Sequence, residues 1–220
     1  VEEVETVRKA LGMDSSNFFL LGHSWGGILA TEYALKYQKN LKGLIISNMV
    51  PSIPDYVKYA NEVLGPKLPA DVLAKIRAFE AKGDYTNPEY LKIITDYYYP
   101  EHVLRMPPAN WPDPVKRAFA RMNYPLYLRM QGPSEFGVVG DAALKNWDRK
   151  ADLNTITVPT LSIGGEFDTM DPKAMEALSK AVKDGQFLYC PKGSHMSMYD
   201  DQYTYFTGLV KFIKGVDARK

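Results

Sequence analysis

The pattern Gly-x-Ser-x-Gly at residues 22–26 constrains the fold of this chain more than any other segment. It follows an apolar run over residues 18–21 and precedes a helical pattern over residues 28–37, which together predict a buried strand, a sharp turn and a helix in succession. We expect the turn to hold Ser24 in strained backbone angles, and the two flanking glycines to let the strand and the helix approach closely. The alternative is a glycine- and serine-rich loop that positions nothing.

Two regions, one at each end of the chain, alternate apolar strands with amphipathic helices. This alternation predicts an α/β protein with a mostly parallel sheet and flanking helices. Besides the elements around Ser24, we expect a helix over 1–12, strands over 44–47, 160–165 and 187–190, and helices over 172–183 and 203–214.

The segment between these regions, residues 51–152, contains no convincing strand. Its helical periodicity is broken by prolines and glycines. Helices are expected over 55–64, 70–82, 89–105 and 114–130. The segment is rich in aromatic residues, most of which we interpret as helix-packing core. An insert this long usually carries a function, such as a lid or a binding surface.

The composition narrows the class of protein further. A net charge of +1 over 220 residues gives no reason to expect nucleic acid or an acidic membrane surface as a partner. No apolar run approaches the roughly 18 residues that a membrane span needs. The single cysteine, Cys190, excludes an internal disulfide framework and multi-cysteine metal sites, and its place in an apolar strand predicts a buried structural thiol. A cytoplasmic location is the expectation, but the absence of a signal peptide says little about it, because this sequence does not establish the true N-terminus.

A serine hydroxyl is a weak nucleophile at neutral pH and needs a base that a third group orients. The chain has three histidines. His23 precedes Ser24, so its side chain points away from that of Ser24, and we interpret it as structural. His102 lies beside three tyrosines in the helical insert, where packing or substrate lining is expected. His195 follows the last expected strand and opens on the sheet edge where ligands bind, so it is the predicted base.

The acid that orients the base is expected after the preceding strand. Three carboxylates lie there, Glu166, Asp168 and Asp171. Glu166 is nearest the strand and is expected to support the site from behind. Asp171 precedes a proline and is typical of a helix N-cap. Asp168 is therefore the predicted acid, and the order Ser24, Asp168, His195 is that of a catalytic triad in the α/β hydrolases.

These residues resemble the α/β-hydrolase superfamily, and four motifs resemble its proline iminopeptidases, also called prolyl aminopeptidases. The motifs are Gly-His-Ser-Trp-Gly-Gly at 22–27, Gly-Pro-Ser-Glu-Phe at 132–136, Gly-Glu-Phe-Asp-Thr-Met-Asp-Pro at 165–172 and Gly-Ser-His-Met-Ser-Met at 193–198. Some esterases and haloperoxidase-like hydrolases share the first. The resemblance implies an α/β-hydrolase core at 1–50 and 153–220 with an all-helical cap domain at 51–152. It spans the chain but covers only the C-terminal two thirds of a family member.

The resemblance implies that Glu135 binds the free α-amino group of the substrate. An aminopeptidase must distinguish a free N-terminus from an internal peptide bond, and a carboxylate does so by pairing with the ammonium group. A second carboxylate usually shares this role, and Glu101 is the candidate. The alternative for both residues is a solvated charge, or for Glu135 a helix cap.

The sequence departs from the family upstream of Ser24. Family members carry a His-Gly-Gly-Pro-Gly-like turn that supplies one backbone donor of the oxyanion hole, and no such turn is present in this chain. The backbone amide of Trp25 is expected to supply the other donor. Because the N-terminal strands of the fold are also absent from this sequence, we expect a companion N-terminal segment, either as a separate chain or as residues outside this sequence.

The expected activity is that of a serine aminopeptidase. It releases an N-terminal residue, expected to be proline, from a short peptide with a free N-terminus. No metal or organic cofactor is implied. Two alternatives stay open. One is an esterase, lactonase or amidase that uses the same triad, and the other is a non-catalytic binding protein with the same fold.

Overall fold

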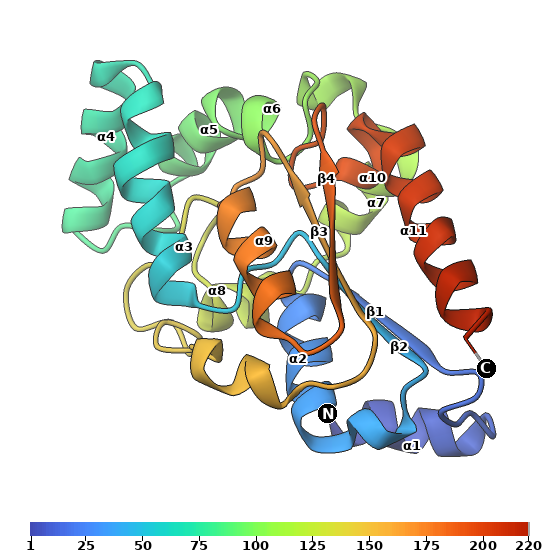
Figure 1. Ribbon diagram of the computed structural model, residues 1–220. Coiled ribbons are helices and arrows are strands. Elements are labelled where there is room, and N and C mark those ends of the chain that lie inside the picture. The colour runs from blue at the N-terminus through green and yellow to red at the C-terminus, as the bar shows by residue number, and fades with distance from the viewer. Residues whose placement is uncertain (220) are drawn as a thin grey trace. The chain divides into compact units, whose positions relative to one another are not determined.

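The computed structural model describes residues 1–219 and divides the chain into two compact units (Figure 1). Unit 1 consists of Val1–Pro51 and Arg149–Lys220, and unit 2 consists of Ser52–Asp148. The predicted domain boundaries, after residues 50 and 152, lie close to these divisions. That unit 2 acts as a cap stays a prediction.

Unit 1 is built on a parallel sheet with the strand order β1-β2-β3-β4. In the register, His23 lies beside Ser47 and Gly165 lies beside Cys190, so the strands end at one common edge. The two central strands are buried along their whole length, which explains their continuous apolar sequence. The predicted parallel sheet is confirmed. The strands are β1 (Phe19–His23), β2 (Gly43–Ser47), β3 (Thr160–Gly165) and β4 (Gly185–Cys190).

Helices cover both faces of this sheet. Helices α2 (Trp25–Tyr37) and α9 (Pro172–Ala181) lie on one face, and α11 (Gln202–Asp217) lies on the other (Figure 1). Because the strands follow one another across the sheet in chain order, right-handed crossovers place α2 and α9 on the same side. Unit 1 also contains α1 (Glu2–Ala10), η1 (Gln38–Asn40), η5 (Lys150–Thr155) and α10 (Ser197–Asp200).

The core between the sheet and α11 is apolar. Cys190 belongs to it as a free, fully buried thiol, and burial raises its pKa to about 12. The predicted burial of this cysteine is therefore confirmed. The buried residues of this cluster are Ile45, Leu161, Ile163, Cys190, Tyr205, Leu209, Phe212 and Val216.

Unit 2 is helical, and its described residues form no strand beyond one isolated bridge between Ser52 and Asp148. This agrees with the all-helical insert expected from the sequence. Its elements are α3 (Ile53–Tyr59), the π-helix η2 (Ala60–Leu64), η3 (Gly65–Lys67), α4 (Ala70–Ala81), α5 (Pro88–Tyr97), α6 (Tyr99–His102), η4 (Pro108–Asn110), α7 (Asp113–Ala120) and α8 (Tyr124–Met130).

Two helices that the sequence predicted as continuous are each divided in two in unit 2, so these two predictions are wrong. The helix expected over 89–105 breaks before Pro100, which lacks an N–H and clashes with the preceding turn. The helix expected over 114–130 stops at Ala120 and restarts at Tyr124. There the Asn123 side chain accepts a hydrogen bond from the Leu126 amide at 3.3 Å, as an N-cap does.

No helix among residues 1–219 combines the length and the apolar character that crossing a bilayer requires.

Candidate active site

The four strands of unit 1 end at one edge of the sheet, and the predicted triad residues follow three of them. Ser24 follows β1 directly, Asp168 lies in the loop after β3, and His195 lies in the loop after β4. Asn48 follows β2 directly. In parallel sheets this carboxyl edge is where ligands bind. The fold therefore brings residues from four separate parts of the chain to one place.

Ser24 occupies a strained turn, as the sequence predicts. Its backbone has φ 55° and ψ −126°, a conformation that side-chain-bearing residues rarely adopt. Gly22 is required sterically, since a Cβ there would lie 1.9 Å from the carbonyl oxygen of Gly26. The same expectation for Gly26 is wrong, because a Cβ on Gly26 would meet no described atom within 4 Å apart from its chain neighbours and the backbone of its own helix. Instead Gly27 lets the helix pack, since a Cβ there would lie 2.6 Å from that of Met49.

His195 connects Ser24 with Asp168. Its Nδ1 lies 2.9 Å from Asp168 Oδ1, and its Nε2 lies 2.8 Å from Ser24 Oγ. A carboxylate only accepts hydrogen bonds, so the first contact requires the proton on Nδ1. The lone pair of Nε2 then faces the Ser24 hydroxyl, as a general base must. The structure thus brings together all three predicted triad residues, with His195 between Asp168 and Ser24, as general-base activation of the serine requires.

Asp168 is fully buried, and His195 is nearly so. The Oδ1 atom of Asp168 also accepts hydrogen bonds from the Met170 amide at 3.2 Å and the Thr169 hydroxyl at 3.3 Å. These donors come from the same loop and hold the carboxylate plane in place. Asp171 caps α9 by accepting from the Lys173 amide at 2.9 Å, which confirms its predicted structural role.

His23 is the last residue of β1 and contacts the loop that carries the base. Its Nε2 donates a hydrogen bond to the backbone carbonyl of His195 at 2.7 Å, and the two rings lie 5.0 Å apart. Withdrawal of the ring from water, together with the neighbouring His195, lowers the pKa of His23 to about 4. His23 is therefore neutral near pH 7, and its side chain contacts the loop that carries the base.

The amide of Trp25 lies at the start of α2. As the first residue of the helix, Trp25 has a backbone N–H with no intrahelical acceptor, and the first turn of α2 contains no acidic residue. The positive end of the helix dipole lies there as well, which favours a developing negative charge. The indole side chain is 44% exposed.

Glu135 lies in unit 2, where it is buried with only 8% of its surface exposed. The Tyr127 hydroxyl donates to its Oε1 at 2.7 Å, and Gln131 Nε2 donates to its Oε2 at 2.9 Å. Its own amide donates to the Tyr99 hydroxyl at 3.3 Å, and its carbonyl accepts from Tyr56 at 2.6 Å. Burial, together with the Glu135 carboxylate, raises the pKa of Tyr127 well above its ordinary value, so this phenol stays a neutral donor.

The predicted second carboxylate, Glu101, is not part of this arrangement. It is exposed on the short helix α6, and within residues 1–219 no hydrogen bond or ion pair joins it to Glu135. His102 is buried in the same helix with its ring 4.9 Å from that of Tyr98, which agrees with a packing role. From the sequence, most aromatic residues of unit 2 are interpreted as core, and neither Tyr127 nor Gln131 is connected with Glu135, although both lie within eight residues of it.

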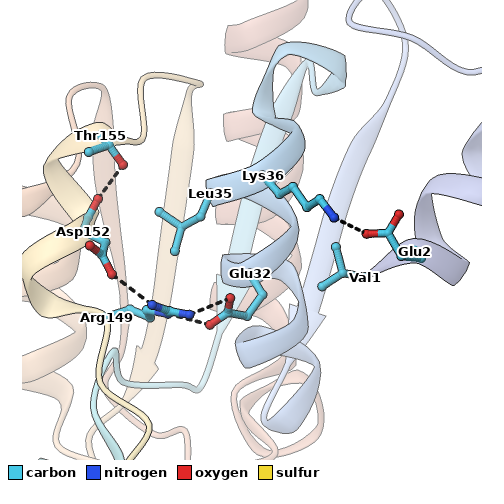
Figure 2. A pocket seen from close by; sticks show the side chains of 8 residues that line it. All are labelled: Val1, Glu2, Glu32, Leu35, Lys36, Arg149, Asp152 and Thr155. Carbon is cyan, nitrogen blue, oxygen red and sulfur yellow. Dashed lines mark hydrogen bonds and ion pairs between the residues drawn. The ribbon is translucent and has the colours of Figure 1, made fainter.

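A surface hollow of about 550 Å³ in unit 1 lies apart from the triad (Figure 2). Its charges are already paired: Arg149 contacts both carboxylate oxygens of Glu32 at 2.6 and 3.0 Å, and Lys36 contacts Glu2 at 2.6 Å. We see no feature there that selects a ligand. In the described part of the chain, histidine, cysteine, aspartate and glutamate side chains form no group of three that could hold a metal ion.

A serine on a strained strand-to-helix turn, with an acid and a histidine after later strands of a parallel sheet, defines the α/β hydrolases. The profile of the alpha/beta hydrolase fold family matches residues 1–202. Within this class, proline iminopeptidases from Elizabethkingia meningoseptica and Flavobacterium johnsoniae are 54% and 52% identical to the chain. Each alignment spans the whole chain, and it covers 72% and 73% of these relatives respectively.

Solved structures agree with these relatives. The crystal structure of proline iminopeptidase from Mycobacterium smegmatis is 31% identical with a TM-score of 0.83, over 98% of this chain and 70% of that one. The crystal structure of VinJ is 26% identical with a TM-score of 0.88, over 97% of this chain and 71% of that one. The chain belongs to the proline iminopeptidase family.

Proposed function

We propose that this protein is a serine aminopeptidase that releases an N-terminal residue from short peptides with a free N-terminus, and that this residue is proline. The observation that carries the proposal is the contact of His195 with both Ser24 and Asp168 in unit 1. The proline preference is drawn from the names of relatives that are 54% and 52% identical to this chain over the aligned residues. A cytoplasmic location stays a prediction.

In the proposed first step, Ser24 Oγ attacks the carbonyl carbon of the N-terminal residue. His195 Nε2 takes the hydroxyl proton as the new C–O bond forms, and Asp168 stabilises the resulting imidazolium through its hydrogen bond to Nδ1. The negative charge on the former carbonyl oxygen is stabilised by the Trp25 amide at the N-terminus of α2. His195 then gives its proton to the amine of the shortened peptide as the C–N bond breaks.

In the second step, water hydrolyses the acyl-enzyme. His195 removes a proton from the water as its oxygen attacks the ester carbonyl, and it returns the proton to Ser24 Oγ as the ester bond breaks. The free amino acid leaves, and the triad regains its starting protonation state. No step needs a group beyond the protein and water.

Glu135 is the proposed site for the free amine. Its buried carboxylate receives hydrogen bonds from neutral groups, and among the described residues no lysine, arginine or histidine pairs with it. Buried charges are normally paired, so a buried carboxylate without a cation suits a ligand that brings one. An N-terminal ammonium group supplies this charge, and each carboxylate oxygen keeps a lone pair to accept from it.

The test compares two substrates, proline-β-naphthylamide and p-nitrophenyl acetate, the second of which has no amine. In Ser24→Ala, both activities are expected to fall to background. In Glu135→Gln, we expect kcat/KM for the amide to fall about 10- to 100-fold, the loss of one charge-assisted contact, while the ester rate changes little. Glu62→Gln removes an exposed carboxylate of the same unit and serves as the matched control. Glu101→Gln tests the second predicted carboxylate in the same assay.

Each alternative has its own outcome in this experiment. A Glu135→Gln variant that retains its amide rate contradicts the amine site. A wild-type protein that cleaves the ester but not the amide is an esterase of the same fold. A wild-type protein whose Ser24 is not labelled by a fluorophosphonate supports the non-catalytic binding protein.

A further inference from the structure

Two residues at the carboxyl edge of the sheet share an unusual backbone conformation. Among residues 1–219, Ser24 and Asn48 are the non-glycine residues with positive φ, at 55° and 53°. Each is the first residue after a strand, β1 for Ser24 and β2 for Asn48. Strained backbone gathers at functional positions. The proposed role of Ser24 as the nucleophile explains its backbone strain, whereas the proposed mechanism gives Asn48 no role that would explain its strain.

The side chain of Asn48 contacts both loops that carry the rest of the triad. Its Nδ2 donates to Asp168 Oδ2 at 2.7 Å and lies 3.1 Å from both the Ser194 carbonyl oxygen and Ser197 Oγ. Asn48 and Asp168 are fully buried. Within residues 1–219, Asn48 is the residue whose side chain donates a hydrogen bond to Oδ2 of Asp168. The other hydrogen-bond partners of the Asp168 carboxylate contact Oδ1.

The orientation of the Asn48 amide follows from its partners. The Asp168 carboxylate and the Ser194 carbonyl only accept hydrogen bonds, so the NH₂ end must face them. At the other end, the Ser47 hydroxyl donates to Asn48 Oδ1 at 2.8 Å and is itself 2.9 Å from the Tyr205 hydroxyl. The amide is therefore held at both ends.

We infer that Asn48 is a positioning residue that holds the acid loop and the base loop of the triad in register. This inference rests on the proposed role of Ser24 as the nucleophile. By holding Oδ2, Asn48 turns Oδ1 of Asp168 toward Nδ1 of His195. By contacting the Ser194 carbonyl, it also holds the backbone immediately before His195.

The chemistry explains why an amide suits this position. Asn48 supplies two N–H donors without a charge, so it satisfies a buried carboxylate without competing with His195 for ion pairing. Asparagine also adopts positive φ more readily than most residues that carry a side chain. An aspartate of the same shape would place an acceptor against two groups that only accept, the Asp168 carboxylate and the Ser194 carbonyl.

The first variant is Asn48→Gly, which tolerates the positive φ and removes only the amide. The readout is the second-order rate at which a fluorophosphonate probe labels Ser24, because this rate depends on the triad and not on the peptide substrate. We expect a fall of about 10- to 100-fold, the effect of a small misplacement of catalytic groups. Ser162→Ala, which removes a buried hydroxyl from the neighbouring strand β3, is the control and keeps the wild-type rate. Circular dichroism verifies that each variant is folded.

The second variant, Asn48→Asp, distinguishes positioning from simple loss of structure. Two buried carboxylates in contact share one proton, and the apparent pKa of the pair is raised. With the proton, the introduced carboxyl group donates to Asp168 as the amide does, and without it the two carboxylates repel each other. We therefore expect the labelling rate of Asn48→Asp to decrease at alkaline pH, over a range in which the labelling rate of the wild-type protein stays constant.

The outcomes separate this inference from the proposed function. Labelling of Asn48→Gly at the wild-type rate, or a pH-independent loss in Asn48→Asp, overturns the inference while the triad stands. If Asn48→Gly does not fold, the pH profile of Asn48→Asp decides alone. A wild-type protein that is not labelled at all overturns both. Labelling without cleavage of the prolyl amide overturns only the proposed substrate.

Discussion

Replacing His23 is expected to change how the free energy of unfolding depends on pH. Burial, together with the neighbouring His195, lowers the pKa of His23 to about 4 in the folded protein, and the hydrogen bond from Nε2 to the carbonyl of His195 opposes part of this shift. In the unfolded chain the pKa of a histidine is about 6.5. Between these values, the unfolded chain binds a proton that the folded protein does not.

The magnitude follows from the difference between the two pKa values. Each pKa unit corresponds to about 1.36 kcal/mol, so a change from about 6.5 to about 4 is worth at most about 3 kcal/mol. This stability is fully present above pH ~6.5 and is lost as the pH falls toward 4. Below the folded-state pKa both states bind the proton, and His23 causes no further loss.

The assay is urea unfolding of the wild-type protein and two variants at intervals between pH 8 and pH 4. His23→Gln keeps a donor for the His195 carbonyl but cannot titrate, and His23→Phe lacks both properties. Relative to the wild type, both variants should gain up to about 3 kcal/mol between pH 7 and pH 4. At pH 8, His23→Phe should be the less stable of the two by about 1 kcal/mol, because it leaves a carbonyl without its donor. Parallel pH profiles for all three proteins would refute the reasoning.

Three further predictions concern single side chains. Asp168→Asn should lower kcat by about 10³- to 10⁴-fold without unfolding the protein, because His195 would lose the acceptor that fixes its tautomer; steady-state kinetics and thermal unfolding measure the two effects. Tyr127→Phe should destabilise the protein by about 1–3 kcal/mol in urea unfolding, since it removes one of two side-chain donors to the buried Glu135 carboxylate. Ser162→Ala should leave the free energy of unfolding unchanged or raise it by up to about 1 kcal/mol, because the buried hydroxyl of Ser162 has no hydrogen-bond partner among the described residues. An equal loss for Ser162→Ala and Tyr127→Phe would contradict the last two together.

Much of the fold could be predicted because its signals are local. The apolar run before Ser24 and the glycine two residues earlier predict the strand and the turn, and Asp171 followed by proline predicts the start of α9. The helical periodicity did not reveal the break at Asn123, where a capping asparagine followed by a proline two residues later restarts the helix. Periodicity alone continues through such a position, because the apolar spacing of the two helices happens to agree.

The sequence by itself determined the class of protein. The triad is identified by the order Ser24, Asp168, His195. Each of these residues follows a strand, and the apolar residues just before it in the sequence are enough to predict that strand. The resemblance to proline iminopeptidases added Glu135 as a residue of interest, but not its surroundings.

Only the tertiary structure decided which side chains hold these residues. Asn48 meets Asp168 across 120 residues of sequence, and His23 meets His195 across 172. Such contacts depend on the register of parallel strands, which places the ends of β1 to β4 side by side at one edge. Local sequence patterns do not identify which residues pair across the strands, because the strands pair through backbone groups that all residues except proline share.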